Sequence, residues 1–336
     1  MIMEPHALLQ TIWYFIIGIL LAGYAILDGF DLGIGALFPA LAKSDEDRKR
    51  LFDSIWPFWD GNEVWLITGG AALFAAFPLA YATVFSGFYL ALMLVLFALI
   101  FRAVSIEFWY HDEARRPLWS ATFTIGSLLP SLLYGVALGN VILGVPLDAN
   151  FEFTGSFFTL LRPYPLALGI LGLVAILLQG ASYAALKTDG ELRVRARKAV
   201  KGLWAVFIVA LAISFAATVI YLPQTLTSPY IWVSAALVLA AWTLLRWFSA
   251  SGRDGAAFIM SSASFAGLWG LAGATHFPNL VKSGTEAVAN ITIANASSSE
   301  LTLRVMLIIA LIGMPLVATY SIFVYRVFKG KIETGR

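Results

Sequence analysis

The most constraining feature of this sequence is a succession of long apolar runs that contain almost no charged residues. A helix needs roughly 20 apolar residues to cross a hydrocarbon core about 30 Å thick, and it satisfies its own backbone polar groups there. The stretches that meet this requirement are 11–39, 56–77, 79–102, 119–144, 163–187, 199–222, 230–249, 255–277 and 303–328. The sequence therefore predicts an all-α integral membrane protein with about nine transmembrane helices.

Composition excludes several other classes of protein. Only 12% of the 336 residues are charged and 60% are hydrophobic, whereas soluble domains carry about 25% charged residues. The net charge of +2 argues against nucleic acid as a partner. The chain has no cysteine, so disulfides and thiolate metal sites are excluded. The first apolar run lacks a basic start and a cleavage site, and we expect it to be a retained helix.

The positions of lysine and arginine predict the orientation of the chain. Cytoplasmic loops of membrane proteins collect positive charge. Of the 22 lysines and arginines, all but three fall in every second connection between the expected spans or at the C-terminus, that is, on one side of the membrane. The three exceptions are Arg162, Lys282 and Arg304. We therefore expect the N-terminus outside and the C-terminus in the cytoplasm. The second and third spans are separated only by the Phe77-Pro78 region, which predicts a very tight hairpin.

Acidic residues inside the first two expected spans are the main candidates for function. Asp28 and Asp31 are three residues apart and share a helix face, and so do Asp60 and Glu63. Ionisable groups within a membrane are costly, which makes each of them a functional hypothesis. With the predicted orientation, all four lie in the cytoplasmic half.

Two interpretations of these acids remain open on spacing alone. Together with Arg102 at the end of the third span, they would form a proton path from the cytoplasm. Alternatively, they are buried ion pairs or helix caps that hold the first three spans together, and Asp60 is an N-cap.

The histidines argue against a redox centre in this chain. Haem in a helical bundle usually needs an axial His, Met or Cys within a span. His6, His111 and His276 each lie near a predicted membrane boundary, and the methionines are expected to pack. We therefore expect no catalytic, cofactor-binding or metal-ligating residue in this chain.

Several long motifs together resemble subunit II of cytochrome bd-type quinol oxidases, from residue 10 to about 325. Two of them contain the acids described above: Asp28-Gly29-Phe30-Asp31-Leu32-Gly33-Ile34-Gly35 and Trp59-Asp60-Gly61-Asn62-Glu63-Val64-Trp65-Leu66. The others are residues 69–78, 85–89, 101–102, 295–299 and 306–316.

The resemblance implies a fold, a partner and a location. A single membrane domain, 1–336, would contain two four-helix bundles, 11–144 and 163–277, and a peripheral ninth helix, 303–328. The partner would be subunit I, which carries two b-type haems and haem d. The complex would lie in the prokaryotic cytoplasmic membrane, oxidise quinol, reduce O2 to water and take the protons for water from the cytoplasm.

The resemblance also implies roles for individual residues. Asp60 matches a position that lines a proton route towards the haems, and Asp28 and Asp31 are expected companions. Trp65 matches a position near an apolar oxygen channel. Glu63 falls where some relatives carry an amide. A quinone bound structurally in this subunit and a small single-helix accessory subunit are both compatible with the resemblance.

Two other classes of function would also place acidic residues within membrane spans. A proton-coupled secondary transporter would also place acids within a glycine-rich span. Such transporters usually show repeat symmetry and broken helices at the midplane, and the sequence shows neither clearly. A purely structural membrane partner would use the acids for assembly alone.

Overall fold

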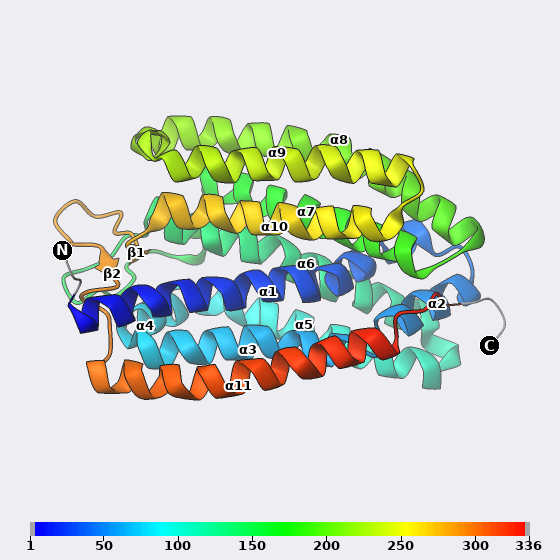
Figure 1. The fold of residues 1–336 in the computed structure, drawn as a ribbon, viewed down its shortest axis with the longest axis horizontal. Helices are drawn as coiled ribbons and strands as arrows, with labels where there is room; N and C mark the ends of the chain where they lie inside the picture. The colour runs from blue at the N-terminus through cyan, green and yellow to red at the C-terminus, as the bar shows by residue number, and fades with distance from the viewer. Residues whose placement is uncertain (1–3, 333–336) are drawn as a thin grey trace.

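The structure is a computed structural model that describes residues 4–332 and is almost entirely helical (Figure 1). Its α-helices are α1 (Pro5–Leu41), α2 (Asp45–Ile55), α3 (Trp59–Ala76), α4 (Pro78–Gly87), α5 (Tyr89–His111), α6 (Arg116–Leu143), α7 (Pro163–Lys187), α8 (Gly190–Tyr221), α9 (Pro229–Ala250), α10 (Asp254–His276) and α11 (Glu300–Val327). A short antiparallel sheet pairs β1 (Asn279–Val281) with β2 (Ile291–Thr292).

Eight helices of the described chain are long and apolar enough to cross a membrane: α1 and α5 to α11. These eight correspond to eight of the nine expected spans. The remaining one, 56–77, corresponds to α3, which does not meet the same hydropathy criterion. The polar residues Asp60, Asn62 and Glu63 in its first turns lower its mean hydropathy.

The expected tight hairpin at Phe77-Pro78 is wrong. Phe77 separates α3 from a distinct short helix, α4, and Phe88 separates α4 from α5. Pro78 is the first residue of α4, where its missing N–H and fixed φ cost nothing. The expected span 79–102 is thus two helices, and the membrane-crossing part of it, α5, continues to His111.

Helix α1 lies at the centre of the molecule (Figure 1). It packs against α3, α6, α7 and α10, and α11 runs along its side as a mostly exposed helix. With 37 residues it is about 55 Å long, which exceeds the hydrocarbon thickness. Phe30, Ile34 and Phe38 are completely or almost completely buried along its second half.

Helices α1 and α7 approach each other closely through two glycines. A Cβ on Gly33 would lie 2.2 Å from the carbonyl oxygen of Ile176 and 2.7 Å from the backbone nitrogen of Gly180. A Cβ on Gly180 would lie 2.3 Å from the carbonyl carbon of Gly33. Because only glycine permits this separation, the pair fixes how deeply α1 sits in the bundle.

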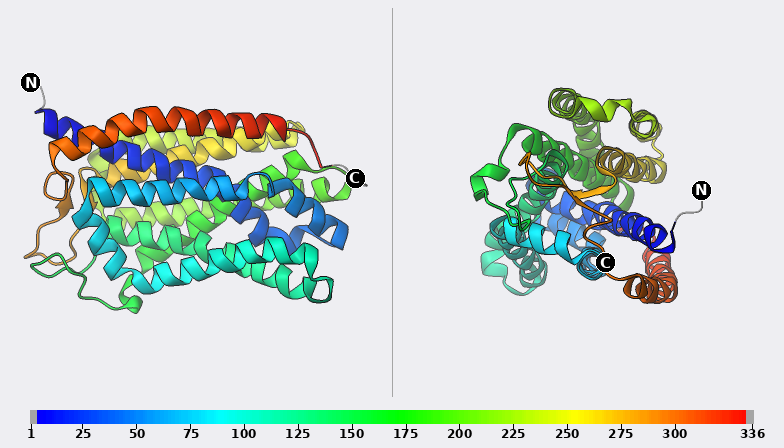
Figure 2. Two further views of the ribbon diagram at one scale, coloured as in Figure 1. Left: turned by 90° about the horizontal axis from the view of Figure 1, so that it is seen from below. Right: turned by 90° about the vertical axis from the view of Figure 1, so that its left-hand side faces the viewer.

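The two ends of the helical bundle differ in character (Figure 2). The loops that follow α6 and α10 gather at the end where α1 begins, and both strands of the sheet belong to the loop after α10. Ser298 of the second loop donates its backbone N–H to Ala76 at 2.9 Å, which ties that loop to the end of α3. At the other end, Arg193 and Arg197 pair with Asp254, at 2.5 Å and 2.9 Å. The α2 end is therefore rich in arginine.

We expect Gly33→Ala to destabilise the protein, because the added methyl group meets backbone atoms that cannot move away. Overpacking of this kind costs about 1–3 kcal/mol. A thermal melt of the detergent-solubilised protein, followed by size-exclusion chromatography, checks this. Gly18→Ala on the same helix is the matched control, since a Cβ there has no atom within 4 Å. Equal melting temperatures for the two variants would contradict the expectation.

Candidate functional site

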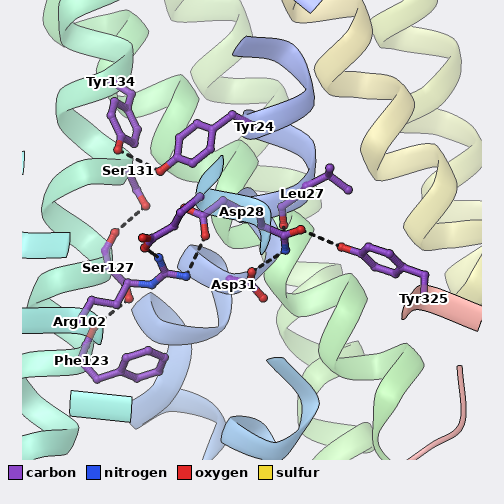
Figure 3. Close-up of polar contacts among 12 residues, drawn as sticks. Tyr24, Leu27, Asp28, Asp31, Arg102, Phe123, Ser127, Ser131, Tyr134 and Tyr325 are labelled. Atoms are coloured by element: carbon purple, nitrogen blue, oxygen red, sulfur yellow. Dashed lines mark hydrogen bonds and ion pairs between the residues drawn. The ribbon is translucent and has the colours of Figure 1, made fainter. Parts of the chain in front are cut away.

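The centre of the candidate site is Arg102 of α5, whose side chain is completely buried (Figure 3). Its Nη2 donates to Oδ1 of Asp28 on α1 at 2.8 Å, and its Nη1 donates to Oε1 of Glu63 on α3 at 2.8 Å. The Asp28 side chain is also completely buried, while that of Glu63 is 24% exposed. One guanidinium therefore joins three helices through two charge-assisted hydrogen bonds.

Asp31 lies one turn further along α1 and does not contact Arg102 directly. Its Oδ2 accepts a hydrogen bond from Nδ2 of Asn62 at 2.8 Å, and the same Nδ2 lies 3.2 Å from the carbonyl oxygen of Leu27. The hydroxyl of Tyr325 on α11 donates to Oδ1 of Asn62 at 3.2 Å. Asn62 thus links α1, α3 and α11 (Figure 3).

Close packing between α5 and α6 encloses Arg102. A Cβ on Gly126 of α6 would lie 2.6 Å from the carbonyl oxygen of Ala98 and 3.0 Å from Cβ of Arg102. The backbones of the two helices can approach because Gly126 has no side chain. Asp28 lies 13 residues before the end of α1, or about 20 Å along the axis, so these groups are deep within the bundle.

Some polar atoms of this network have no hydrogen-bond partner among the described residues. They are Oδ2 of Asp28, Oδ1 of Asp31 and Nε of Arg102. The network contains three carboxyl groups and one guanidinium, so full ionisation would leave two uncompensated negative charges. An uncompensated buried charge costs several kcal/mol. The network is therefore neutral when two of its three carboxyl groups hold protons, and Asp28 and Asp31 each have one oxygen that is free to accept a proton.

A second polar group continues from Asp28 towards the start of α1. Tyr24, one turn earlier on α1, places its hydroxyl 2.9 Å from that of Tyr134 on α6. Ser127 and Ser131 of α6 lie between this pair and Arg102 in Figure 3, and each donates to a backbone carbonyl of its own helix. Polar atoms thus extend along the α1–α6 contact from Arg102 towards the start of α1.

The structure brings together four of the five residues expected to line a proton path: Asp28, Asp31, Glu63 and Arg102. Asp60 is exposed, and among residues 4–332 no hydrogen bond or ion pair is made by its carboxyl group. It is the second residue of α3, whose N-cap is Phe58, so the alternative that Asp60 caps the helix is wrong.

The other interpretation from sequence was that the acids form buried ion pairs. This holds for Asp28 and Glu63, which both pair with Arg102. Ion pairing and proton transfer are compatible here, because Asp28 keeps an unpartnered oxygen.

Trp65 is half-buried, and its indole ring lies against Gly23 of α1. A Cβ on Gly23 would be 2.5 Å from a ring carbon of Trp65. The glycine therefore provides the flat surface on which the ring packs. The expected position of Trp65 near an apolar oxygen channel stays a prediction.

The histidines lie apart from the network, near helix ends. His6 contacts the carbonyl oxygen of Ser298, His111 is exposed, and His276 is buried with Nε2 2.9 Å from the carbonyl oxygen of Leu280. None of the three is placed in the middle of a helix, where an axial haem ligand would be needed. Within residues 4–332, no group of three His, Asp or Glu side chains is arranged to hold a metal ion.

Sequence reasoning missed four residues of this site. Asn62 lies inside one of the motifs, and its position between Asp60 and Glu63 within an expected span was the available signal. Tyr24 precedes Asp28 by four residues, which places both on one face of α1. Tyr134 and Tyr325 carry no local signal, because their partners are 110 and 263 residues away in the chain.

Comparison with known proteins identifies the family. The sequence model of the family described as cytochrome bd terminal oxidase subunit II matches residues 9–328 of this chain. Cytochrome bd-I ubiquinol oxidase subunit 2 of Escherichia coli strain K12 is 36% identical over 98% of this chain and 97% of its own length. Cytochrome bd ubiquinol oxidase subunit 2 of Bacillus subtilis strain 168 is 33% identical over 97% of this chain and 98% of its own length.

A solved structure has the same fold. This is the structure of the bd oxidase from Geobacillus thermodenitrificans. One of its chains matches with a TM-score of 0.80 and 16% sequence identity, and the match covers 95% of this chain and 98% of the Geobacillus chain. The sequence matches extend over nearly the whole length of both partners and do not favour the transporter alternative. The chain therefore belongs to the cytochrome bd terminal oxidase subunit II family.

Proposed function

We propose that this chain is the haem-free subunit II of a cytochrome bd-type quinol oxidase, which oxidises quinol and reduces O2 to water. Within that complex, this chain supports the haem subunit and carries protons towards it from the cytoplasm. The observation that supports this role best is the buried network in which Asp28 and Glu63 pair with Arg102, with Asp31 three residues further along α1. In this network Asp28 and Asp31 each keep one carboxylate oxygen without a hydrogen-bond partner among the described residues.

The redox chemistry belongs to the partner, subunit I. In this proposal, two b-type haems and haem d are bound there and supply electron transfer and O2 reduction. The histidines of this chain do not fit axial haem ligation, since each lies at or near a helix end. This chain's own residues are suited to packing, to charge compensation and to holding protons.

Charge places the α2 end of the bundle at the cytoplasmic face in this proposal. Arginine and lysine residues accumulate there, as the positive-inside rule requires. Helix α3 is then the ninth crossing: it runs beside α1 although its first turns are polar. The arrangement divides into a first bundle within 11–144, a second within 163–277 and the peripheral α11, in a multi-pass protein of a prokaryotic cytoplasmic membrane.

The exposed and buried acids form a graded sequence that a proton could follow. Asp60 is exposed, Glu63 three residues later is partly exposed, and Asp28 is completely buried. Arg102 contacts both Glu63 and Asp28, so a charge that moves between them stays close to a fixed positive group. Burial and the nearby guanidinium oppose each other, and that balance permits a carboxylate to take up and release a proton.

We expect Asp60→Asn to lower quinol-driven O2 consumption by on the order of tenfold or more, with normal assembly. The amide cannot carry a proton, and contributions of proton-transfer groups are typically of this size or larger. Assembly is expected to be normal because the Asp60 side chain is exposed and makes no hydrogen bond or ion pair with the described residues. O2 uptake by the purified complex, normalised to haem content, measures the effect.

The matched control for Asp60→Asn is Glu191→Gln. Glu191 is also an exposed acid in the first turn of a helix, but it lies on α8. Its replacement should leave turnover unchanged. If Asp60→Asn instead reduced the yield of complex and left turnover per haem unchanged, the purely structural role would be supported.

Arg102→Met should prevent assembly of a stable complex. Removal of one partner of a buried ion pair costs about 3–5 kcal/mol, because the remaining carboxylates lose their compensating charge. Arg102→Lys, which keeps a positive charge without the forked geometry, should be intermediate. The yield of haem-containing complex on size-exclusion chromatography is the measurement. A normal yield for Arg102→Met would mean that the ion pairs are dispensable.

A reduced-minus-oxidised visible spectrum tests the assignment of the haems. We expect haem b and haem d bands in the complex of this chain with its partner, and no haem bands in this chain expressed alone. Haem bands in the separately expressed, folded chain would contradict the haem-free assignment.

A further inference from the structure

We propose that Tyr325 is a positioning residue for Asp31, and that the chain segment Phe328–Ile332 holds it in place. The inference deepens the proposed function, because it rests on Asp31 acting as a proton-accepting group. Tyr325 does not touch Asp31; it acts through the side-chain amide of Asn62.

The hydrogen bonds around Asn62 define what Tyr325 does. Asn62 is almost completely buried, and its Nδ2 donates to Asp31 and to the carbonyl oxygen of Leu27. Its Oδ1 has the Tyr325 hydroxyl as its donor. A buried acceptor left without a donor is costly, so removal of this hydroxyl would favour rotation of the amide away from its present orientation. Tyr325 therefore holds Asn62 in the orientation that donates to Asp31.

Aromatic contacts fix the ring of Tyr325. It stacks on Phe58 with ring centroids 4.5 Å apart and an interplanar angle of 20°, and it meets Phe30 edge-on at 6.4 Å. Phe58 directly precedes α3 and Phe30 lies between Asp28 and Asp31 on α1. The ring is thus held by the same two helices that carry the acids.

The segment after α11 is anchored by two cationic side chains. Lys187, at the end of α7, donates through Nζ to the carbonyl oxygens of Phe328 and Gly330, and its own carbonyl accepts the N–H of Ile332 at 2.8 Å. Arg50 of α2 donates to the carbonyl oxygen of Ile332 at 2.9 Å. Carbonyls at a helix end lack intrahelical donors, and a cation there also interacts favourably with the helix dipole. These contacts fix the end of α11 and hence Tyr325.

A pocket of about 230 Å³ lies beneath this segment. Asp53, Ser54 and Lys331 line it together with Lys187 and Phe58. Because Phe58 also stacks on Tyr325, this pocket is connected to the Tyr325–Asn62–Asp31 contacts through one aromatic ring.

The test is Tyr325→Phe in the intact haem-containing complex, with Tyr320→Phe as control. The substitution keeps the stacked ring and removes only the hydroxyl. Tyr320 is on the same helix, and its side chain is exposed. Infrared difference spectra between two pH values report the Asp31 carboxyl group, whose band is the one that Asp31→Asn removes. Turnover per haem is measured in parallel.

We expect Tyr325→Phe to shift the Asp31 band and to lower turnover roughly threefold to tenfold, with Tyr320→Phe unchanged in both. Lys187→Met, which releases the segment but keeps an apolar stem, should shift the same band. It also provides a second variant if Tyr325→Phe assembles poorly. In an Asn62→Ala background, Tyr325→Phe should have no further effect on the band.

The possible outcomes separate this inference from the proposed function. An Asp31 band in Tyr325→Phe identical to that in Tyr320→Phe would overturn the inference, and so would spectra in which Asp31→Asn removes no band. A shifted band combined with normal turnover in the Asp31→Asn and Asp60→Asn variants would support the positioning role of Tyr325. That same result would refute the proton route of the proposed function.

Discussion

The arrangement of the first half of the molecule depends on one buried guanidinium. Arg102 is the positive group that compensates Asp28 and Glu63, and through them α5 is joined to α1 and α3. In a membrane interior an unpaired acid of this kind would be excluded or neutralised. The same cation that permits these carboxyl groups to be buried does not balance all of them, and this shortage of positive charge is the basis of the proton-carrying role proposed for the network.

The geometry of this network requires close contact between helices. Gly126 lets α6 approach α5 beside Arg102, and Gly33 lets α7 approach α1 two residues beyond Asp31. Hydrophobic burial does not distinguish helix from lipid, so packing of small residues largely determines which helices associate in a membrane. The glycines thus serve the site indirectly, because they bring its polar groups within hydrogen-bond distance.

The site combines stability and function in different residues. Arg102, Asp28 and Glu63 are held in ion pairs that connect three helices, and Asp31 is held only through Asn62. Asp60 is exposed on the surface of this chain. Asp28 belongs to both groups, because one of its oxygens is paired with Arg102 and the other has no partner among the described residues.

Long apolar runs determined the fold class, and all but one of the expected crossings meet the criterion for a membrane span. The sequence also indicated that Asp28 and Asp31 share a helix face, since that follows from the period of the helix. It could not show the break at Phe88, because the residues on both sides of it are equally apolar. Nor could the sequence show that Asp60 is exposed whereas Glu63 pairs with Arg102, because both acids lie in the first turns of α3.

The amino-acid sequence by itself determined the membrane environment, the helical nature of the chain and the identity of the acids and Arg102, because these depend on composition and short-range periodicity. The tertiary structure decided which acid is buried and which is exposed, and it brought Tyr134 and Tyr325 to the network. Those outcomes depend on the rotation and depth of each helix against its neighbours. Rotation and depth are set by contacts between residues more than 100 positions apart, such as Gly33 with Gly180 and Tyr325 with Asn62.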